Sequence, residues 1–141
     1  MLILKKNNEH GIVSLRLGEK IMRMHMLPPI ILCRQHLNGE HGEIHKFRPD
    51  FERRYRITGR VFPEVQIQPC KMKERHDLLA KEMIRRGGNH QSPYEMPFLS
   101  HIPLKELLRK PDLKNNLKVL LKCPECRKRY IQYKYHNSEG L

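Results

Sequence analysis

Residues 72–88 read MKERHDLLAKEMIRRGG, the clearest helical pattern in the chain. Apolar residues recur there every three or four positions, which places them on one face of a helix, and charged residues fill the opposite face. The apolar stripe consists of Met72, His76, Leu79, Ala80 and Met83, and the charged face of Lys73, Glu74, Lys81 and Arg85. Gly87 and Gly88 follow, and glycine commonly ends helices. The stretch therefore predicts an amphipathic helix that buries one side.

Prolines mark three further predicted helices, because proline is tolerated in a first helical turn. The predicted starts are Pro28 or Pro29, Pro103 and Pro111, and the predicted ends are Arg48–Pro49, Leu108 and Leu121. Pro124 then precedes a basic, aromatic tail at residues 127–135. We predict an all-α fold of about four helices with long irregular loops, in a single domain that spans residues 22–141.

The composition excludes several classes of protein. The chain has 141 residues, of which 30% are charged, and a mean hydropathy of −0.71. Its apolar runs, such as residues 26–33, are far shorter than the roughly 20 residues that span a bilayer, so we expect no membrane association. Residues 1–21 lack the apolar core of a secretory signal. The four cysteines are then expected to be reduced, in a cytoplasmic protein.

The charge of the chain predicts a polyanionic partner. Lys and Arg number 28 against 15 Asp and Glu, which gives a net charge of +13. Residues 22–45 hold as many acidic as basic side chains, whereas residues 46–61 and 104–141 are strongly basic. Solvated helix faces explain most charge runs, but this excess is large. A nucleic acid is the partner that this charge predicts.

The most informative motif is QHLNGEHGE, residues 35–43. On a helix, its residues His36, Glu40 and Glu43 lie close to one face, at steps of four and three. Periodicity alone favours a solvated face with a His–Glu pair. The alternative is that these polar groups carry chemistry.

Two separated blocks resemble the pyrimidine-dimer DNA glycosylases, a family that includes a phage endonuclease acting on ultraviolet-damaged DNA. The blocks are LCRQHLNGEHGE at residues 32–43 and RGGNHQSP at residues 86–93, and CPEC at residues 123–126 is similar to a segment of cellular members. The resemblance covers about residues 22–130. It implies a compact all-α DNA repair enzyme, a glycosylase with abasic-site lyase activity, that flips nucleotides out of the duplex and needs no cofactor. We expect a monomer that acts on double-stranded DNA.

The resemblance also implies the reacting groups: a chain-terminal α-amine that forms a Schiff base with the damaged nucleotide, and a glutamate that assists. An α-amine suits this role because its pKa of about 7.7–8.0, against about 10.4 for lysine, leaves far more neutral amine near pH 7. The catalytic residues implied are Met22, Glu43 and His36. The DNA-binding residues expected are Arg23, Arg34, Gln35, Lys46, Arg53, Arg54, Arg127, Lys128 and Lys134.

A terminal amine at residue 22 requires a chain that starts there. Residues 1–21 contribute no recognisable element, and Gly18-Glu19 can be encoded by a purine-rich string at the distance of a bacterial ribosome-binding site. We therefore predict that Met22 is the native start and that residues 1–21 are an extension from a mis-assigned start. Lys20 is the fallback nucleophile.

One residue departs from the family pattern. The phage enzyme carries a DNA-contacting arginine at the position of Gly42, and Arg34 and Lys46 are the candidates to compensate. Gly39 and Gly42 each cost a helix about 1 kcal/mol relative to alanine. Their presence predicts a close neighbour, which is either DNA or the chain terminus, or else a tightly packed helix.

Two sets of residues have metal-ligand spacing. His41 and His45 are four positions apart, although surface histidines are the commoner explanation. Cys123-x-x-Cys126 is a zinc half-site that needs two more ligands, from Cys33, Cys70 or His136.

We predict no metal site. Two other functions stay open at this stage: a non-catalytic basic nucleic-acid-binding protein on the same scaffold, and a zinc-stabilised module built on the cysteine pair. In the first of these, the aromatic and basic side chains of residues 133–135 would suit unstacked bases.

Overall fold

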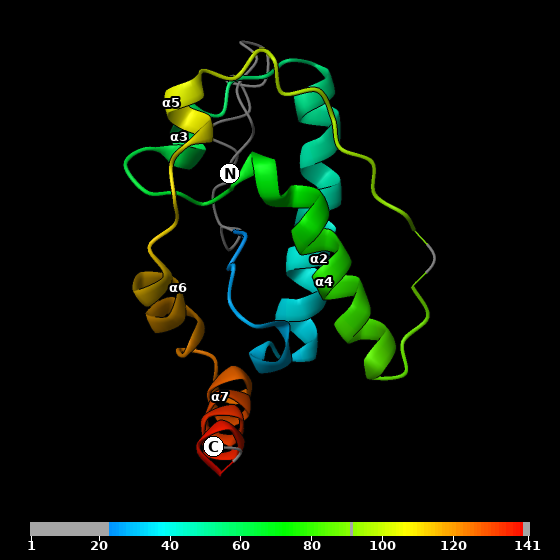
Figure 1. Cartoon of the computed structure of the whole chain (residues 1–141), viewed down its shortest axis with the longest axis vertical. Helices are drawn as coiled ribbons and strands as arrows, with labels where there is room; N and C mark the ends of the chain where they lie inside the picture. Colours follow the sequence, from blue (N-terminus) through cyan, green and yellow to red (C-terminus); the bar gives the residue numbers. More distant parts are fainter. Residues whose placement is uncertain (1–22, 91, 140–141) are drawn as a thin grey trace, which may run out of the picture.

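The computed structural model describes residues 23–90 and 92–139, and this part of the chain is helical, with no strand (Figure 1). The elements are η1 (Pro29–Ile31), α2 (Arg34–Glu52), α3 (Thr58–Val61), η2 (Pro69–Lys71), α4 (Met72–Arg85), α5 (Leu104–Leu107), α6 (Leu113–Leu120) and α7 (Pro124–Glu139). Four of these helices have eight residues or more, which confirms the predicted all-α fold. No helix of the described part is long and apolar enough to cross a membrane.

Two predicted boundaries are wrong. The helix predicted from Pro28 or Pro29 is only a 3-10 turn there, and α2 begins after Cys33, whose Sγ accepts the N–H of His36. Pro49 lies inside α2, because Phe51 in the turn beyond it is buried in the core. The Arg53 N–H donates to the Pro49 carbonyl at 3.0 Å.

Pro124 starts a helix as well as ending a segment. It occupies the first position of α7, where its missing N–H costs nothing. The basic tail predicted after it is therefore a 16-residue helix. The aromatic rings of Tyr130 and Tyr133 on this helix are half-buried against the core.

The core forms between α2 and α4, which cross in Figure 1. Phe47 and Phe51 of α2 and Leu79 of α4 are among its fully buried side chains. At the other end of the molecule, α7 packs against η1 and buries Cys126. The turn η1 thus lies between the core pair and the last helix.

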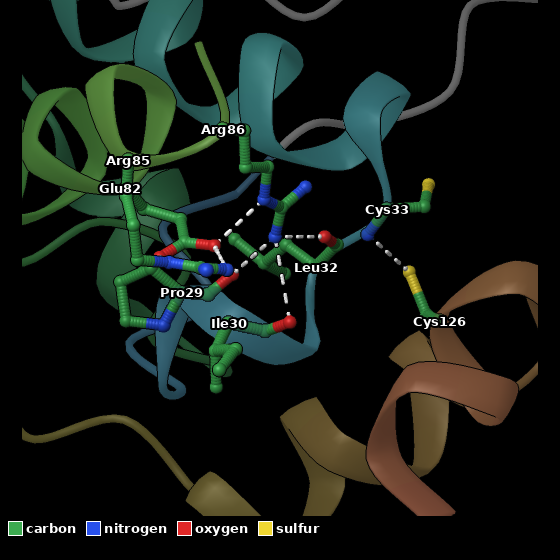
Figure 2. Close-up of polar contacts among 8 residues, drawn as sticks. All are labelled: Pro29, Ile30, Leu32, Cys33, Glu82, Arg85, Arg86 and Cys126. Atoms are coloured by element: carbon green, nitrogen blue, oxygen red, sulfur yellow. Dashed lines mark hydrogen bonds and ion pairs between the residues drawn. The ribbon is translucent and has the colours of Figure 1, made fainter. Parts of the chain in front are cut away.

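The end of α4 explains the RGGNH motif in structural terms. Gly87 has a φ of +89°, and the Gly88 N–H donates to the Met83 carbonyl at 2.8 Å. The Arg86 guanidinium, held by Glu82, donates to the carbonyls of Pro29 at 3.1 Å and Leu32 at 2.8 Å (Figure 2). The motif therefore ends α4 and ties it to η1.

Replacing Gly88 with alanine is expected to lower the free energy of unfolding by about 1–3 kcal/mol. A Cβ at residue 88 lies 2.8 Å from the Met83 carbonyl oxygen, so the backbone must shift. Urea denaturation measures the effect. Gly59→Ala is the control, because a Cβ there meets no described atom within 4 Å. Equal losses in the two variants would contradict the packing argument.

Candidate active site

The segment that follows residue 22 is held in place through its backbone. The Met24 N–H donates to the Gln66 carbonyl at 2.8 Å, and Asn116 Nδ2 donates to the His25 carbonyl at 2.9 Å. Arg75 Nη1 donates to the Leu27 carbonyl at 2.6 Å. The position of residue 23 is therefore fixed by contacts from three distant parts of the chain.

A buried ion pair supports the same segment. Arg75 Nε and Nη2 donate to the two carboxylate oxygens of Glu40 at 2.6 and 3.0 Å, and the two side chains are 3% and 0% exposed. The backbone N–H groups of His25 and Met26 also donate to Glu40. Glu40 is thus a structural anchor rather than a member of a solvated face.

Arg23, the first residue that the structure describes, has its side chain in a polar cluster. Its guanidinium forms an ion pair with Glu64 and approaches Asn116 Oδ1 at 3.4 Å. Asn115 Nδ2 donates to the same Glu64 carboxylate at 3.1 Å. These contacts join the start of the described chain to the loop before η2 and to α6.

Arg60 lies in the electrostatic field of both Arg23 and Glu43. Arg60 is buried, with its guanidinium 5.1 Å from the centre of the Phe47 ring. Burial lowers the pKa of Arg60, while the carboxylates of Glu43 and Asp50 raise it and the positive charge of Arg23 lowers it. Glu43 and Arg23 therefore act on one buried cation. A half-buried carboxylate in such surroundings can stabilise a cationic intermediate and transfer protons.

Comparison with known families gives one result. Residues 22–96, more than half of the chain, match the family described as pyrimidine dimer DNA glycosylase. The chain belongs to this family. No curated protein and no solved structure matches the chain. The family match includes Arg23, Glu43, Arg60 and Glu64, and it ends before α5.

This glycosylase-family protein places its three predicted catalytic residues differently. Met22 lies outside the described residues. Glu43 lies in the electrostatic neighbourhood of Arg60, as described above. His36 points elsewhere: its Nδ1 is 3.1 Å from the Sγ of Cys33 and 3.4 Å from that of Cys126. The three polar residues predicted on one helix face, His36, Glu40 and Glu43, thus have separate surroundings, and the catalytic roles stay predictions.

The predicted DNA-binding residues fall into three groups. Arg34, Gln35 and Lys46 are exposed on α2, Arg53 and Arg54 are exposed directly after it, and Arg127, Lys128 and Lys134 are exposed on α7. The end of α2 and α7 lie at opposite ends of the long axis (Figure 1). Arg23 is instead half-buried in its ion pair. Contact of these residues with DNA stays a prediction.

Sequence reasoning missed Arg75, Arg60 and Glu64. A signal existed for Arg75, because it lies three residues after Met72 and four before Leu79, close to the buried stripe of α4. A charged residue there must find a buried partner. The other two lie in a region that the sequence shows only as a basic loop.

Two clusters of potential metal ligands occur among the described residues. One consists of Cys33, His36, Cys123 and Cys126, and the other of His41, His45, His76 and His90. In each cluster the ligand atoms lie within 4.8 Å of one another. Of the candidates to complete the cysteine pair, Cys33 is in place, whereas Cys70 and His136 lie outside the cluster. The fourth member is His36, for which the sequence predicted a catalytic role instead.

Replacing Gly42 with alanine is expected to raise the free energy of unfolding by about 1 kcal/mol, because alanine is the better helix former. A Cβ there meets no atom within 4 Å in the described part of the chain, so tight helix packing is wrong as the reason for this glycine. Thermal and urea denaturation measure the change. Destabilisation would contradict it. Weaker duplex binding by the stabilised variant would favour DNA as the close neighbour.

Proposed function

We propose that this family member is a DNA glycosylase with abasic-site lyase activity on duplex DNA that contains pyrimidine dimers. The proposed nucleophile is the α-amine of a chain that starts at Met22. The observation that carries the proposal is the backbone anchoring of residues 24–27, which fixes the position of Arg23, whose charge acts together with that of Glu43 on the buried guanidinium of Arg60. The family match also begins at residue 22.

The next residue along the chain favours an amine nucleophile at this position. Arg23 carries a positive charge, and a nearby positive charge disfavours protonation of an amine, which favours its neutral, reactive form. The amine attacks the anomeric carbon, and the bond to the base breaks with its electron pair leaving on the base. The sugar ring then opens at the bond between the anomeric carbon and the ring oxygen, which takes up the proton that the amine nitrogen has lost, and a protonated Schiff base forms. Glu43 is the proposed group that stabilises this cation and accepts a proton in the elimination step.

The basic surfaces support a duplex DNA substrate. Arg53 and Arg54 at the end of α2, and Arg127 and Lys128 on α7, are exposed cations at separate places on the molecule. Phosphate contacts from such residues supply affinity that falls steeply with salt. We further propose that the enzyme works as a monomer in the cytoplasm.

Trapping with borohydride tests the proposal. Chains that start at Met1 and at Met22 are incubated with abasic and dimer-containing duplexes, and borohydride reduces any Schiff base to a stable adduct. We expect adducts from the Met22 chain and none from the Met1 chain. Acetylation of the Met22 amine should abolish them.

Other results of these trapping experiments would identify a different nucleophile or exclude catalysis. An adduct from the Met1 chain that is lost in Lys20→Arg would identify Lys20 as the nucleophile. No adduct from either chain would leave a non-catalytic DNA-binding protein. Sequencing the N-terminus of protein made from its natural upstream DNA is expected to find Met22, and an intact Met1 would contradict the assigned start.

A further inference from the structure

We propose that Cys33, His36, Cys123 and Cys126 bind a zinc ion that fastens α7 to the start of α2. This inference is independent of the catalytic proposal. A Cys3His set of four protein ligands is typical of structural zinc, with no position left for substrate.

The distances between the ligand atoms fit tetrahedral zinc. Zinc–sulfur bonds of about 2.3 Å and zinc–nitrogen bonds of about 2.0–2.1 Å place neighbouring sulfurs about 3.8 Å apart and sulfur and nitrogen about 3.5 Å apart. The Sγ atoms of Cys33 and Cys123 are 3.9 Å apart. His36 Nδ1 lies 3.1 Å from Cys33 Sγ and 3.4 Å from Cys126 Sγ. The four atoms can therefore close around one ion with small movements.

The local structure presents the ligands as two similar pairs. Cys33 precedes α2 and His36 lies in its first turn, whereas Cys123 precedes α7 and Cys126 lies in its first turn. Both pairs have two intervening residues, and both lie at helix N-termini, where the helix dipole favours thiolate.

Backbone donors complete the surroundings of the sulfurs. The Cys33 N–H donates to Cys126 Sγ at 3.2 Å (Figure 2), and the His36 N–H approaches Cys33 Sγ at 3.5 Å. Such N–H groups orient thiolates and offset their charge. Cys33 and Cys126 are buried, which shields the site from solvent.

Metal analysis of the purified chain tests this site. Protein prepared without chelator, or reconstituted with zinc alone, is expected to hold one zinc ion more than Cys126→Ser and the same amount as Cys70→Ser. Cys70 is the matched control because it is exposed and outside the cluster. Cobalt in place of zinc should give the intense sulfur-to-metal absorption of a thiolate site.

The wild-type chain decides the outcome even where a variant fails to fold. Absence of the cobalt–thiolate absorption in reconstituted wild-type protein would overturn the proposal. Equal metal loss in Cys70→Ser and Cys126→Ser would overturn it as well.

A second observation independently carries a second site: we infer that His41, His45, His76 and His90 bind another divalent transition metal. His41 Nε2 and His90 Nε2 lie 2.9 Å apart. The Nε2 atoms of His45 and His76 are buried and have no hydrogen-bond partner among the described residues. Unpaired buried nitrogens are costly and call for a partner.

The contact between His76 and Asp77 orients the His76 imidazole as a metal ligand. Its Nδ1 lies 2.9 Å from Asp77 Oδ1, so that Nδ1 carries the hydrogen and Nε2 keeps its lone pair toward the cluster. His76 is 1% exposed, and its Nε2 has no access to water. A set of four imidazoles suits Zn²⁺, Cu²⁺ or Ni²⁺. The site would join α2, α4 and the loop after α4.

Stoichiometry separates the two sites. Reconstitution with zinc is expected to give two ions per wild-type chain, one in Cys126→Ser, one in His90→Gln and none in the double variant. His136→Gln, an exposed histidine outside both clusters, should keep two.

A spectroscopic measurement tests the second site without any variant in it. Cu²⁺ added to the Cys126→Ser chain should give an electron paramagnetic resonance spectrum with nitrogen splitting from several imidazoles. Absence of nitrogen splitting, or a wild-type chain that binds no more than one zinc, would overturn the second site. Loss of metal in His136→Gln equal to that in His90→Gln would also overturn it.

Discussion

Arg75→Met is expected to lower the free energy of unfolding by about 3–5 kcal/mol, because it leaves the Glu40 carboxylate buried without its partner. The pair has both carboxylate oxygens bonded to the guanidinium, and each side chain is at most 3% exposed. The methionine side chain fills similar space without charge. Equilibrium denaturation in urea measures the loss.

Two further variants make this prediction specific. Lys73 lies on the same helix and forms an exposed ion pair with Asp77. Lys73→Met should therefore change the free energy of unfolding by less than about 1 kcal/mol. The double variant Glu40→Leu/Arg75→Met removes both charges and should recover much of the loss. A double variant as unstable as Arg75→Met would mean that the loss does not come from the unpaired carboxylate.

The same substitution bears on function. Arg75 donates to the Leu27 carbonyl, and Glu40 accepts from the backbone of His25 and Met26. We therefore expect Arg75→Met to slow Schiff-base trapping even under conditions where the chain is fully folded. The ion pair would then be a positioning device for the start of the domain.

Glu43→Gln is expected to reduce the rate of borohydride-trapped adduct formation by about 10²–10⁴-fold, the usual contribution of an acid–base group. Glutamine keeps the size of the side chain but cannot accept a proton or balance a cationic intermediate. The measurement is single-turnover trapping on an abasic duplex with the Met22 chain, with duplex binding measured in parallel.

The control for this variant lies on the same helix. Glu52→Gln removes an exposed carboxylate that is paired with Arg48, away from the Arg60 cluster, and should leave trapping unchanged. A Glu43→Gln chain that binds duplex DNA and forms adducts at the wild-type rate would exclude Glu43 as the acid–base group. Loss of binding together with trapping would indicate a role in DNA contact instead.

The helices were predictable where the signal is local. The range of α4 and its end just before Gly87 follow from periodicity and a glycine pair, and both are confirmed. The end of α2 was not predictable from Pro49, since one turn beyond a proline depends on packing: Phe51 in that turn is buried in the core. Tertiary burial thus outweighed a local helix-breaking signal.

The site was predictable only in part, because its contacts join distant segments. The family motif indicated Glu43, but Arg60 lies on the four-residue helix α3 and Glu64 on the loop after it, and neither segment shows a sequence pattern. For each ligand cluster, the sequence indicated two of the four members by their spacing: Cys123 with Cys126, and His41 with His45. Their other members come from chain segments tens of residues away, and only the fold brings them together.

The turn η1 couples two parts of the molecule that belong to different ranges of the sequence. Arg86 binds the carbonyls of Pro29 and Leu32, and Cys126 accepts the N–H of the next residue, Cys33 (Figure 2). The family match includes the first contact and stops short of the second. Residues 29–33 therefore connect the part of the chain that matches the family to the last helix, α7. In related chains we expect Arg86 and Cys126 to be retained or lost together, because both bind the backbone of residues 29–33 and a change in one contact shifts the atoms that the other contact needs.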